Sequence, residues 1–372
     1  PLDTDKFFLI KVFSCYSKIY FMQPKVTILT CVYNGLPYLK EAIDSTLNQS
    51  YIDFEYLIID DCSPDANVVK LIESYDDPRI RFVKNEENLG VSNTFNKALT
   101  LITTPYVVRL DQDDVSLPTR IAEQVDYLET HPELSIVCSW EHTIDSKGNK
   151  IRDWKRTLNN YGDFLGFILI GLCPIWHPSI AFRTDALREA GGFDVEYTRA
   201  EDFEVTARLA LKRYAAAVVP KFHLLQRQHE DSQSREFDDK QAEVTKRIHN
   251  ESLQYFYSHP DIEELAEFIR LEKNSNNKFN QNYLLRISLI LKELFTHIKD
   301  KQKMNDEEMK SLKKIVYRRA GYGLRYASFL SRLPTVLFHP TFYILSPLQL
   351  TTFRRTLSSF YRNFLELRYL FK

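Results

Sequence analysis

The sequence predicts an α/β protein in which a mostly parallel sheet is flanked by helices, with an added C-terminal helical region. Between residues 25 and 139, short apolar runs rich in β-branched and aromatic residues alternate with segments whose apolar residues recur at helical spacing. The strand runs are nearly continuous in apolar residues, as expected of parallel strands that are covered on both faces. This alternation is the βαβαβ pattern of an open sheet wound with right-handed crossovers.

The expected strands are 26–32, 54–59, 80–83, 106–110 and 135–139. Apolar residues at helical spacing predict helices within 36–47, 68–72 and 95–102. Ligands of open parallel sheets bind beyond the carboxyl ends of the strands, so the residues directly after each strand form the candidate site.

Polar segments follow the first four expected strands. They are residues 33–35, 60–65, 85–90 and 111–114. Each segment alone has the composition of a turn. Because the carboxyl ends of parallel strands meet at one edge of the sheet, four such segments together favour a binding cleft.

The segment after the fourth strand concentrates negative charge, with Asp111, Asp113 and Asp114 in four residues. Without a cation, at least one of these carboxyls should have a raised pKa. Mg²⁺ or Mn²⁺ commonly takes one or two carboxylates plus phosphate oxygens, so the pattern suggests a metal-bridged diphosphate. Alternatively, one acid caps a helix entered at 115–120. We give that role to Asp114 or Ser116, which leaves Asp111 and Asp113 for the site.

Composition and missing motifs exclude several classes. The 372 residues are 44% hydrophobic and 27% charged, which is ordinary for a globular core and too apolar for a disordered chain. Five widely spaced cysteines without a CxxC pair indicate neither a disulfide framework nor a cysteine zinc site, so a reducing compartment fits best. No P-loop lysine motif or GxGxxG follows the first strand, which disfavours a Walker NTPase or a dinucleotide dehydrogenase.

From residue 25 to about 234, the chain resembles the family 2 inverting glycosyltransferases of the GT-A fold, of the bacterial polysaccharide and glycan-assembly type. The residues that carry the resemblance are Thr-Cys-Val-Tyr-Asn at 30–34, Asp-Asp-Cys-Ser-Pro-Asp at 60–65, Asn-Leu-Gly-Val-Ser at 88–92 with Asn96, Asp-Gln-Asp-Asp at 111–114, and Glu201-Asp202.

The resemblance implies a UDP-sugar donor and a divalent metal, Mn²⁺ or Mg²⁺. It places nucleotide-sugar binding on Thr30, Val32, Tyr33, Asn34, Asp60, Asp61, Asn88, Gly90, Asn93, Asn96, Asp111 and Gln112. An aromatic ring beside uracil and a carboxylate accepting its imide N–H make chemical sense for Tyr33 and Asp60. Asp111 would face the ribose or donor sugar, and Asp113 would bind the metal.

The resemblance also implies roles in the second half of the domain. Glu201 and Asp202 open an amphipathic helix, and the second acid of this pair corresponds to the catalytic base of the family. An acid at a helix N-terminus tends to stay ionised, which suits a base that takes a proton from the acceptor hydroxyl. As an alternative, both are ordinary first-turn acids that favour the helix dipole. His229 would complete the metal shell or touch the diphosphate. Arg227 would pair with phosphate or support the site, and His177 and Glu201 would lie on the acceptor side or support the site.

The near-zero net charge of -1 hides an imbalance, because residues 311–372 carry eleven basic residues against one acidic residue. This basic tail has a net charge of +10, and the preceding 310 residues have -11. Thirteen aromatic residues and scattered prolines in the tail favour helices lying on anionic lipid over a spanning helix. An internal helical hairpin or a homodimer contact is the alternative. Nucleic acid is disfavoured because no recognised motif is present.

We expect an N-terminal extension over 1–24, which resembles neither a signal peptide nor a membrane span. A nucleotide-sugar-binding half covers 25–115, an acceptor and base half 116–238, and the helical region 239–372. The predicted function is metal-dependent inverting transfer from a UDP-sugar to a glycan or lipid-linked saccharide, at the cytoplasmic face of the plasma membrane. One alternative is a sugar-phosphate nucleotidyltransferase, disfavoured because 31–36 lacks a glycine-rich basic loop. The other is a non-catalytic nucleotide-sugar-binding protein.

Overall fold

The computed structural model describes residues 24–229, 239–270 and 281–319. The chain divides into two compact units, which we describe separately. The first unit comprises the chain up to residue 157 together with 175–239, and the second comprises 158–174 and the chain from 240 onward. The predicted N-terminal extension up to residue 23 and most of the basic tail, from residue 320, lie outside the described residues.

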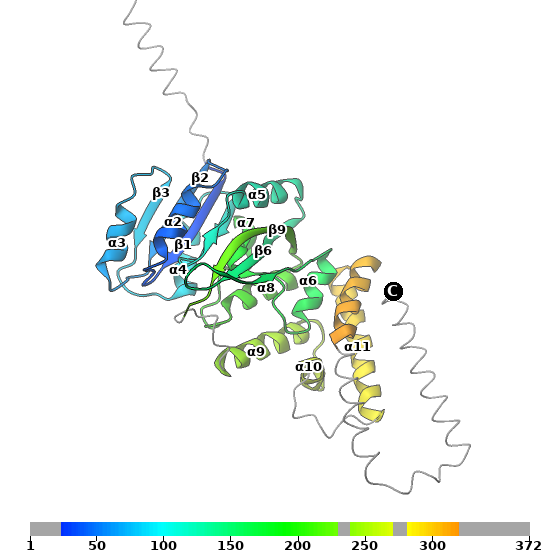
Figure 1. Cartoon of the computed structure of the whole chain (residues 1–372). Helices are drawn as coiled ribbons and strands as arrows, with labels where there is room; N and C mark the ends of the chain where they lie inside the picture. The colour runs from blue at the N-terminus through cyan, green and yellow to red at the C-terminus, as the bar shows by residue number, and fades with distance from the viewer. Residues whose placement is uncertain (1–23, 230–238, 271–280, 320–372) are drawn as a thin grey trace, which may run out of the picture. The chain divides into compact units, whose positions relative to one another are not determined.

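The first unit is built on a nine-stranded sheet with the order β3-β2-β1-β4-β8-β6-β9-β5, and β7 pairs with β6 (Figure 1). The strands β1 to β4 are parallel, β8 is antiparallel to β4 and β6, and β6 is parallel to β9. The strands are β1 Val26–Val32, β2 Phe54–Asp60, β3 Ile80–Lys84, β4 Tyr106–Arg109, β5 Val115–Ser116, β6 Leu134–Ile144, β7 Lys150–Trp154, β8 Ala181–Arg183 and β9 Ala215–Arg227.

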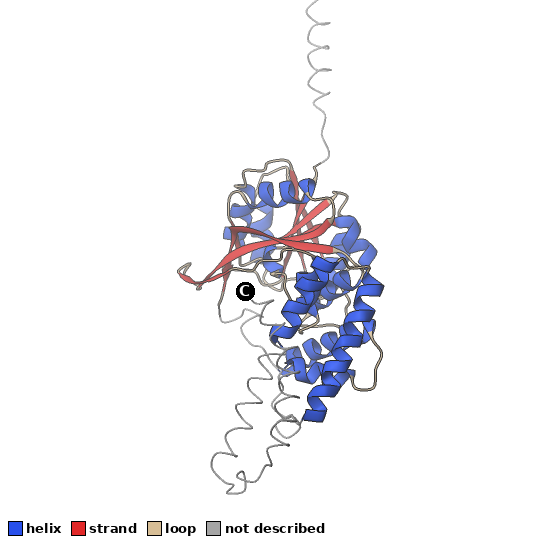
Figure 2. Ribbon diagram, turned by 90° about the vertical axis from the view of Figure 1, so that its right-hand side faces the viewer, coloured by secondary structure: helices blue, strands red, loops and turns tan. Residues whose placement is uncertain are grey.

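Helices flank this sheet (Figure 2). Those of the first unit are α2 Leu39–Leu47, α3 Ala66–Glu73, α4 Val91–Leu101, α5 Arg120–Thr130, η1 His177–Ser179, α7 Thr184–Ala190 and α8 Glu201–Leu211. Side chains such as Ile28, Ile58 and Val108 are fully buried between sheet and helices. The α/β class, the parallel strands β1 to β4 and the strand now labelled β6 are therefore confirmed.

The helix expected to be entered at 115–120 begins at the last of these residues, as α5 from Arg120, but the cap assigned to Asp114 or Ser116 is wrong. Val115–Ser116 is a strand that pairs antiparallel with β9, and α5 begins only after Thr119, which offers no side-chain cap. Asp114 instead accepts the backbone N–H of Arg227 at 2.8 Å, so neither Asp114 nor Ser116 caps α5. Pro118 gives the physical reason, because a proline disfavours helical geometry at the residue before it.

The second unit is helical, with α6 Tyr161–Ile168, α9 Asp239–Phe256, α10 Ile262–Arg270, α11 Gln281–Gln302 and a further helix over 306–319. Gly162 permits close packing here, because a Cβ atom at this position would lie 1.9 Å from the carbonyl oxygen of Glu308. His249 is fully buried and contacts Leu169 O at 2.9 Å and Arg270 Nη1 at 2.8 Å. Among the described helices, none is long and apolar enough to cross a bilayer.

Candidate active site

Asp60 is the last residue of β2, and one oxygen of its carboxylate has no hydrogen-bond partner among the described residues. The residue is fully buried, and its Oδ1 accepts the backbone N–H of Ser63 at 3.2 Å. Its Oδ2 is buried without a hydrogen-bond partner in the part of the chain that the structure describes. Leaving a buried acceptor unsatisfied costs about 1–3 kcal/mol, so an N–H donor from a ligand would be stabilising there.

Tyr33 and Gln112 join the ends of β1 and β4. The side-chain oxygen of Gln112 accepts the Tyr33 N–H at 2.8 Å, and its amide nitrogen donates to the Tyr33 carbonyl at 3.0 Å. Asn34 is held beside them, because its N–H donates to Ser63 Oγ at 3.0 Å. The Tyr33 side chain is 45% exposed, which leaves its ring available to a flat ligand.

The side chains of two residues expected to bind the nucleotide are instead buried against the covered sheet. Thr30 is fully buried, and its hydroxyl donates to the carbonyl of Leu110 at 2.9 Å. Val32 is also fully buried, and its carbonyl accepts the Asp61 N–H at 2.7 Å. Thr30 lies within β1 and Val32 is its last residue, and because both side chains are fully buried in the covered sheet, neither has a free face toward the site.

Asp61 organises the loop that follows β3. Its carboxylate accepts from the Asn85 side chain at 2.7 Å and from the backbone N–H groups of Leu89 and Gly90, each at 2.9 Å. Asn88 in the same loop accepts the Gly90 N–H at 3.2 Å, and Asn93 in the first turn of α4 donates to the Leu89 carbonyl at 2.9 Å. These predicted binding residues therefore lie together, with polar groups that shape the loop.

Asn96 serves a different purpose from the predicted nucleotide contact. Its amide oxygen accepts the Phe193 N–H and its amide nitrogen donates to the Phe193 carbonyl, both at 2.8 Å. The loop leading to α8 is thus clasped to α4. Because one side chain satisfies both backbone groups, Asn96 is a structural clamp.

The acidic segment after β4 approaches His229 at the end of β9. Asp113 Oδ2 lies 2.9 Å from His229 Nε2, so the two predicted metal ligands meet. Burial, followed by the charge of Asp111, raises the pKa of Asp113, and His229 opposes this. The pKa of Asp114 is raised well above its usual value, by burial first and then by Asp113 and Asp111. The raised pKa expected in this segment thus agrees with the burial of Asp113 and Asp114. In the part of the chain that the structure describes, no three or more His, Cys, Asp or Glu side chains lie close enough together to hold a metal ion.

Arg227 supports this segment and does not face outward as a phosphate partner. Its guanidinium donates to the Asp113 carbonyl at 3.0 Å and to Glu41 at 2.5 Å, and lies 4.6 Å from the Tyr38 ring centroid. The side chain is only 2% exposed. Its donors are directed at the protein, which assigns it to holding Asp113 in place.

Arg109, which the sequence reading missed, links Asp111 to His177. Its Nε donates to Asp111 Oδ1 at 2.6 Å, its Nη1 lies 3.2 Å from His177 Nε2, and its guanidinium lies 4.7 Å from the Phe95 ring centroid. Because a guanidinium only donates, His177 accepts through Nε2, and its ring proton is on Nδ1. The signal in the sequence was a lone arginine ending an apolar strand directly before the acidic segment.

Glu201 and Asp202 open α8, as predicted. Asp202 Oδ1 accepts the Phe203 N–H at 2.7 Å, and among the described residues its Oδ2 has no hydrogen-bond partner. Burial raises the pKa of Asp202, and burial followed by the Asp202 charge raises that of Glu201; Arg109 opposes both shifts. Burial therefore outweighs the groups that lower the pKa of Asp202, which are the Phe203 N–H first and then Arg109.

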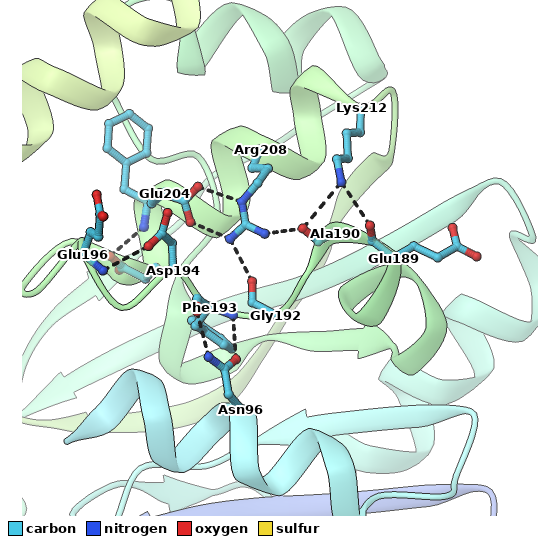
Figure 3. A network of polar contacts seen from close by, with 12 residues as sticks. Asn96, Glu189, Ala190, Gly192, Phe193, Asp194, Glu196, Glu204, Arg208 and Lys212 are labelled. Atoms are coloured by element: carbon cyan, nitrogen blue, oxygen red, sulfur yellow. Dashed lines mark hydrogen bonds and ion pairs between the residues drawn. The ribbon is translucent and has the colours of Figure 1, made fainter. Parts of the chain in front are cut away.

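Arg208 fixes the loop that leads into α8 (Figure 3). Its guanidinium pairs with Glu204 at 2.6 Å and donates to the carbonyls of Ala190 and of Gly192, the latter at 2.8 Å. Both ends of the loop are thereby tied to one side chain. Together with the Asn96 clamp, this fixes where α8 presents its first turn.

Replacing Arg208 with Met is expected to lower the free energy of unfolding by about 2 kcal/mol, because it leaves Glu204 and two carbonyls without their donor. Urea denaturation followed by circular dichroism measures this. Lys212→Met is the matched control: its ammonium also reaches the Ala190 carbonyl, at 3.5 Å, but is exposed. Its expected effect is within about 0.5 kcal/mol, and an equal loss in both variants would contradict the assigned role of Arg208.

The sequence of this chain is similar to those of known proteins. A family model described as "Glycosyl transferase family 2" matches residues 27–191. An uncharacterized glycosyltransferase of Haemophilus influenzae is 31% identical over 247 residues, which cover 63% of this chain and 74% of that protein. The chain belongs to glycosyltransferase family 2. It is therefore a glycosyltransferase, which confirms the predicted enzyme class.

Two further proteins are similar to this chain. An uncharacterized glycosyltransferase of Methanocaldococcus jannaschii is 29% identical to this family 2 chain over 205 residues, 54% of this chain and 70% of that protein. Residues 1–349 of S. aureus TarS, solved with UDP-GlcNAc, superpose with a TM-score of 0.52 at 17% identity and cover 83% of this chain and 91% of that one. At this identity the likeness bears on the fold alone, and the predicted GT-A fold with an added helical region is confirmed.

Proposed function

We propose that this enzyme moves a sugar from a UDP-sugar to a saccharide hydroxyl, with a divalent metal and with inversion at the anomeric carbon. The observation that carries the proposal is the Asp113–His229 pair, which the fold assembles from residues 116 positions apart. Asp113 follows β4 and His229 follows β9. Asp60, whose Oδ2 has no hydrogen-bond partner among the described residues, is the last residue of β2 in the same sheet. A donor with a diphosphate and an imide N–H matches both features.

The residues present fit a metal ion of this kind. Mg²⁺ and Mn²⁺ prefer oxygen ligands, and the softer Mn²⁺ accepts an imidazole more readily than Mg²⁺ does. Such ions usually keep one or two protein carboxylates and take the other ligands from phosphate and water. Asp113 and His229 would hold the ion, and Arg227 holds the backbone of Asp113 in place. When bound, the ion would offset the negative charge that develops on the leaving diphosphate.

Asp202 would act as the catalytic base. Its unpartnered Oδ2 takes the proton of the acceptor hydroxyl while that oxygen forms its bond to the anomeric carbon. The bond between the anomeric carbon and the diphosphate oxygen breaks, and its electron pair leaves with UDP. A single displacement of this kind inverts the anomeric configuration.

The names of similar proteins support the choice of substrates. TarS has been solved with UDP and with UDP-GlcNAc. Relatives include a putative teichuronic acid biosynthesis glycosyltransferase of Bacillus subtilis and the chondroitin synthase of Escherichia coli. We therefore propose a glycan or lipid-linked saccharide as acceptor. Contact of the basic tail with the cytoplasmic membrane face stays a prediction, because most of the tail lies outside the described residues.

Product analysis tests the proposed reaction. Incubation with UDP-glucose, UDP-galactose or their N-acetylamino forms, Mn²⁺ and a membrane extract is expected to release UDP, and EDTA is expected to stop it. NMR of the product is expected to show the anomeric configuration opposite to that of the donor. Formation of a UDP-sugar from UTP and a sugar phosphate would favour the nucleotidyltransferase alternative. UDP binding without turnover would favour the non-catalytic one.

Arg109→Gln is expected to move the acidic limb of the pH profile of kcat/KM to higher pH. The base must be deprotonated, and the positive charge of Arg109 lowers the pKa of Asp202 against the larger effect of burial. Without that charge the pKa of Asp202 rises, so activity is lost at a higher pH as the solution is acidified. Arg109→Lys keeps the charge and is expected to restore part of the shift. An unchanged profile in Arg109→Gln would sink this assignment.

A further inference from the structure

The guanidinium of Arg109 is held by three neighbouring side chains of the first unit. Its Nε donates to Asp111 Oδ1 at 2.6 Å, and its Nη1 lies 3.2 Å from His177 Nε2. Its central carbon lies over the Phe95 ring, 4.7 Å from the ring centroid. The Arg109 side chain is only 13% exposed, and the attraction between a cation and an aromatic face grows where water is excluded. Phe95 therefore helps to fix where the charge of Arg109 lies.

The charge of Arg109 acts on acids in both halves of the site. It pairs with Asp111 after β4, and it also reaches Glu201 and Asp202 at the start of α8. Burial raises the pKa of Asp202, and the Phe203 N–H and then Arg109 lower it. For Glu201, burial and then the Asp202 charge raise the pKa, and Arg109 again lowers it. Because the energy between two charges depends on their separation, a displaced guanidinium changes how strongly it favours an ionised Asp202.

The Phe95 ring is itself fixed by α4 and by Phe193. The rings of Phe95 and Phe193 lie 5.0 Å apart at 28°, and the Phe193 ring lies 5.8 Å from that of His177. All three side chains are buried. The backbone of Phe193 is clasped by Asn96, the residue after Phe95 on α4 (Figure 3). Gly192 permits this close approach, because a Cβ atom there would lie 2.4 Å from Asn96 Oδ1.

We propose that Phe95 is a positioning residue of the active site, whose ring fixes the Arg109 guanidinium where it pairs with Asp111 and where its charge reaches the first turn of α8. The ring acts through Arg109. The helix that carries it, α4, begins after Gly90 in the loop predicted to bind the nucleotide, so one helix joins that loop to the arginine beside the base. The inference rests on the proposed glycosyl transfer for calling Asp202 the base.

The titration of Asp202 tests this role without any turnover. In the full chain with isotope-labelled aspartate carboxyls, its NMR signal is identified by its loss in Asp202→Asn and followed as the pH is varied. Phe95→Leu removes the ring, so that Arg109 is held less closely and water screens its charge. We expect the titration midpoint of Asp202 to rise by roughly half a pH unit. In Arg109→Gln no charge remains to be placed, so adding Phe95→Leu is expected to cause little further change.

Phe54→Leu is the matched control for Phe95→Leu. Phe54 is also buried, and the guanidinium of Arg79 lies 4.6 Å from its ring centroid. It is the first residue of β2, at the opposite end of that strand from Asp60. Losing this equivalent contact is expected to leave the titration of Asp202 unchanged.

A second variant separates the charge distribution of the ring from its shape. Pentafluorophenylalanine in place of Phe95 has nearly the same shape, but its fluorines make the face of the ring positive, so that it repels a cation. We expect the Asp202 midpoint to rise here too, and circular dichroism confirms that each protein is folded. An unchanged midpoint in the folded Phe95 variants, or an equal shift with and without the charge of Arg109, would overturn the proposal.

Turnover of the UDP-sugars by the same proteins separates this inference from the proposed function. A protein that transfers a sugar, but in which the titration of Asp202 does not respond to Phe95, refutes the positioning role alone. A protein in which Asp202 responds to Phe95 through Arg109, but which transfers no sugar, retains the positioning role and refutes the proposed transfer.

Discussion

Replacing Asp202 with Asn is expected to reduce turnover by about 10²- to 10⁴-fold, the range that a general base contributes. The amide fills the same space and can still accept the Phe203 N–H, which the carboxylate now does at 2.7 Å. It cannot take a proton from the acceptor hydroxyl. UDP affinity should therefore stay at the wild-type value, because the predicted donor contacts come from the ends of β1 to β4. Single-turnover assays with donor and acceptor, together with UDP calorimetry, measure the two quantities separately.

Glu201→Gln is the matched control for this variant, since it removes one carboxylate from the same helical turn. We expect a clearly smaller loss of turnover than in Asp202→Asn. If Glu201→Gln shows the large loss and Asp202→Asn does not, the base is Glu201. If UDP binding and turnover fall together in Asp202→Asn, the substitution has disturbed the donor site, and the assignment of Asp202 as base is wrong.

The half of the sheet formed by β1 to β4 could be predicted because its signal is local. Each strand is a nearly continuous apolar run bounded by polar residues, and each helix between them has apolar residues at helical spacing. The strands β5, β7, β8 and β9 were missed. β8 has three residues and β5 has two, and β9 contains three alanines and Pro220, which have low strand propensity. Their pairing depends on partners distant in the sequence.

The candidate site divides in the same way. Asp113, His229 and Asp202 could be named from motifs, and the structure brings Asp113 and His229 within 2.9 Å. Arg109 could not, because an arginine in an apolar strand shows no partner until Asp111 and His177 are placed beside it. Asn96 was assigned to the nucleotide although its amide is used by Phe193, a contact across 97 positions that the sequence does not show. Motifs thus indicate which groups have suitable chemistry, and the fold decides which of them remain available.

Asp113→Asn is expected to abolish the metal dependence of donor binding. Even a supporting partner of a metal ligand changes affinity by about 10- to 100-fold, so losing a direct carboxylate ligand should weaken Mn²⁺-dependent UDP binding by at least about 100-fold. An amide oxygen is neutral and a poorer ligand for a hard cation. The affinity for UDP should then equal that of the wild type measured in EDTA. Calorimetric titrations of UDP with and without Mn²⁺ measure this difference.

Asp114→Asn tests whether the effect belongs to Asp113 or to any loss of charge in this segment. Burial first, and then the charges of Asp113 and Asp111, raise the pKa of Asp114 well above its usual value, so this position disfavours the charged carboxylate and an amide of the same shape suits it. The amide oxygen can still accept the Arg227 N–H, which the carboxyl accepts at 2.8 Å. We therefore expect Asp114→Asn to keep Mn²⁺-dependent UDP binding within a few-fold of the wild type. If Asp113→Asn and Asp114→Asn lost the metal dependence of UDP binding equally, Asp113 would not be the specific ligand. If neither variant lost it, the metal that supports UDP binding would not be held by this segment.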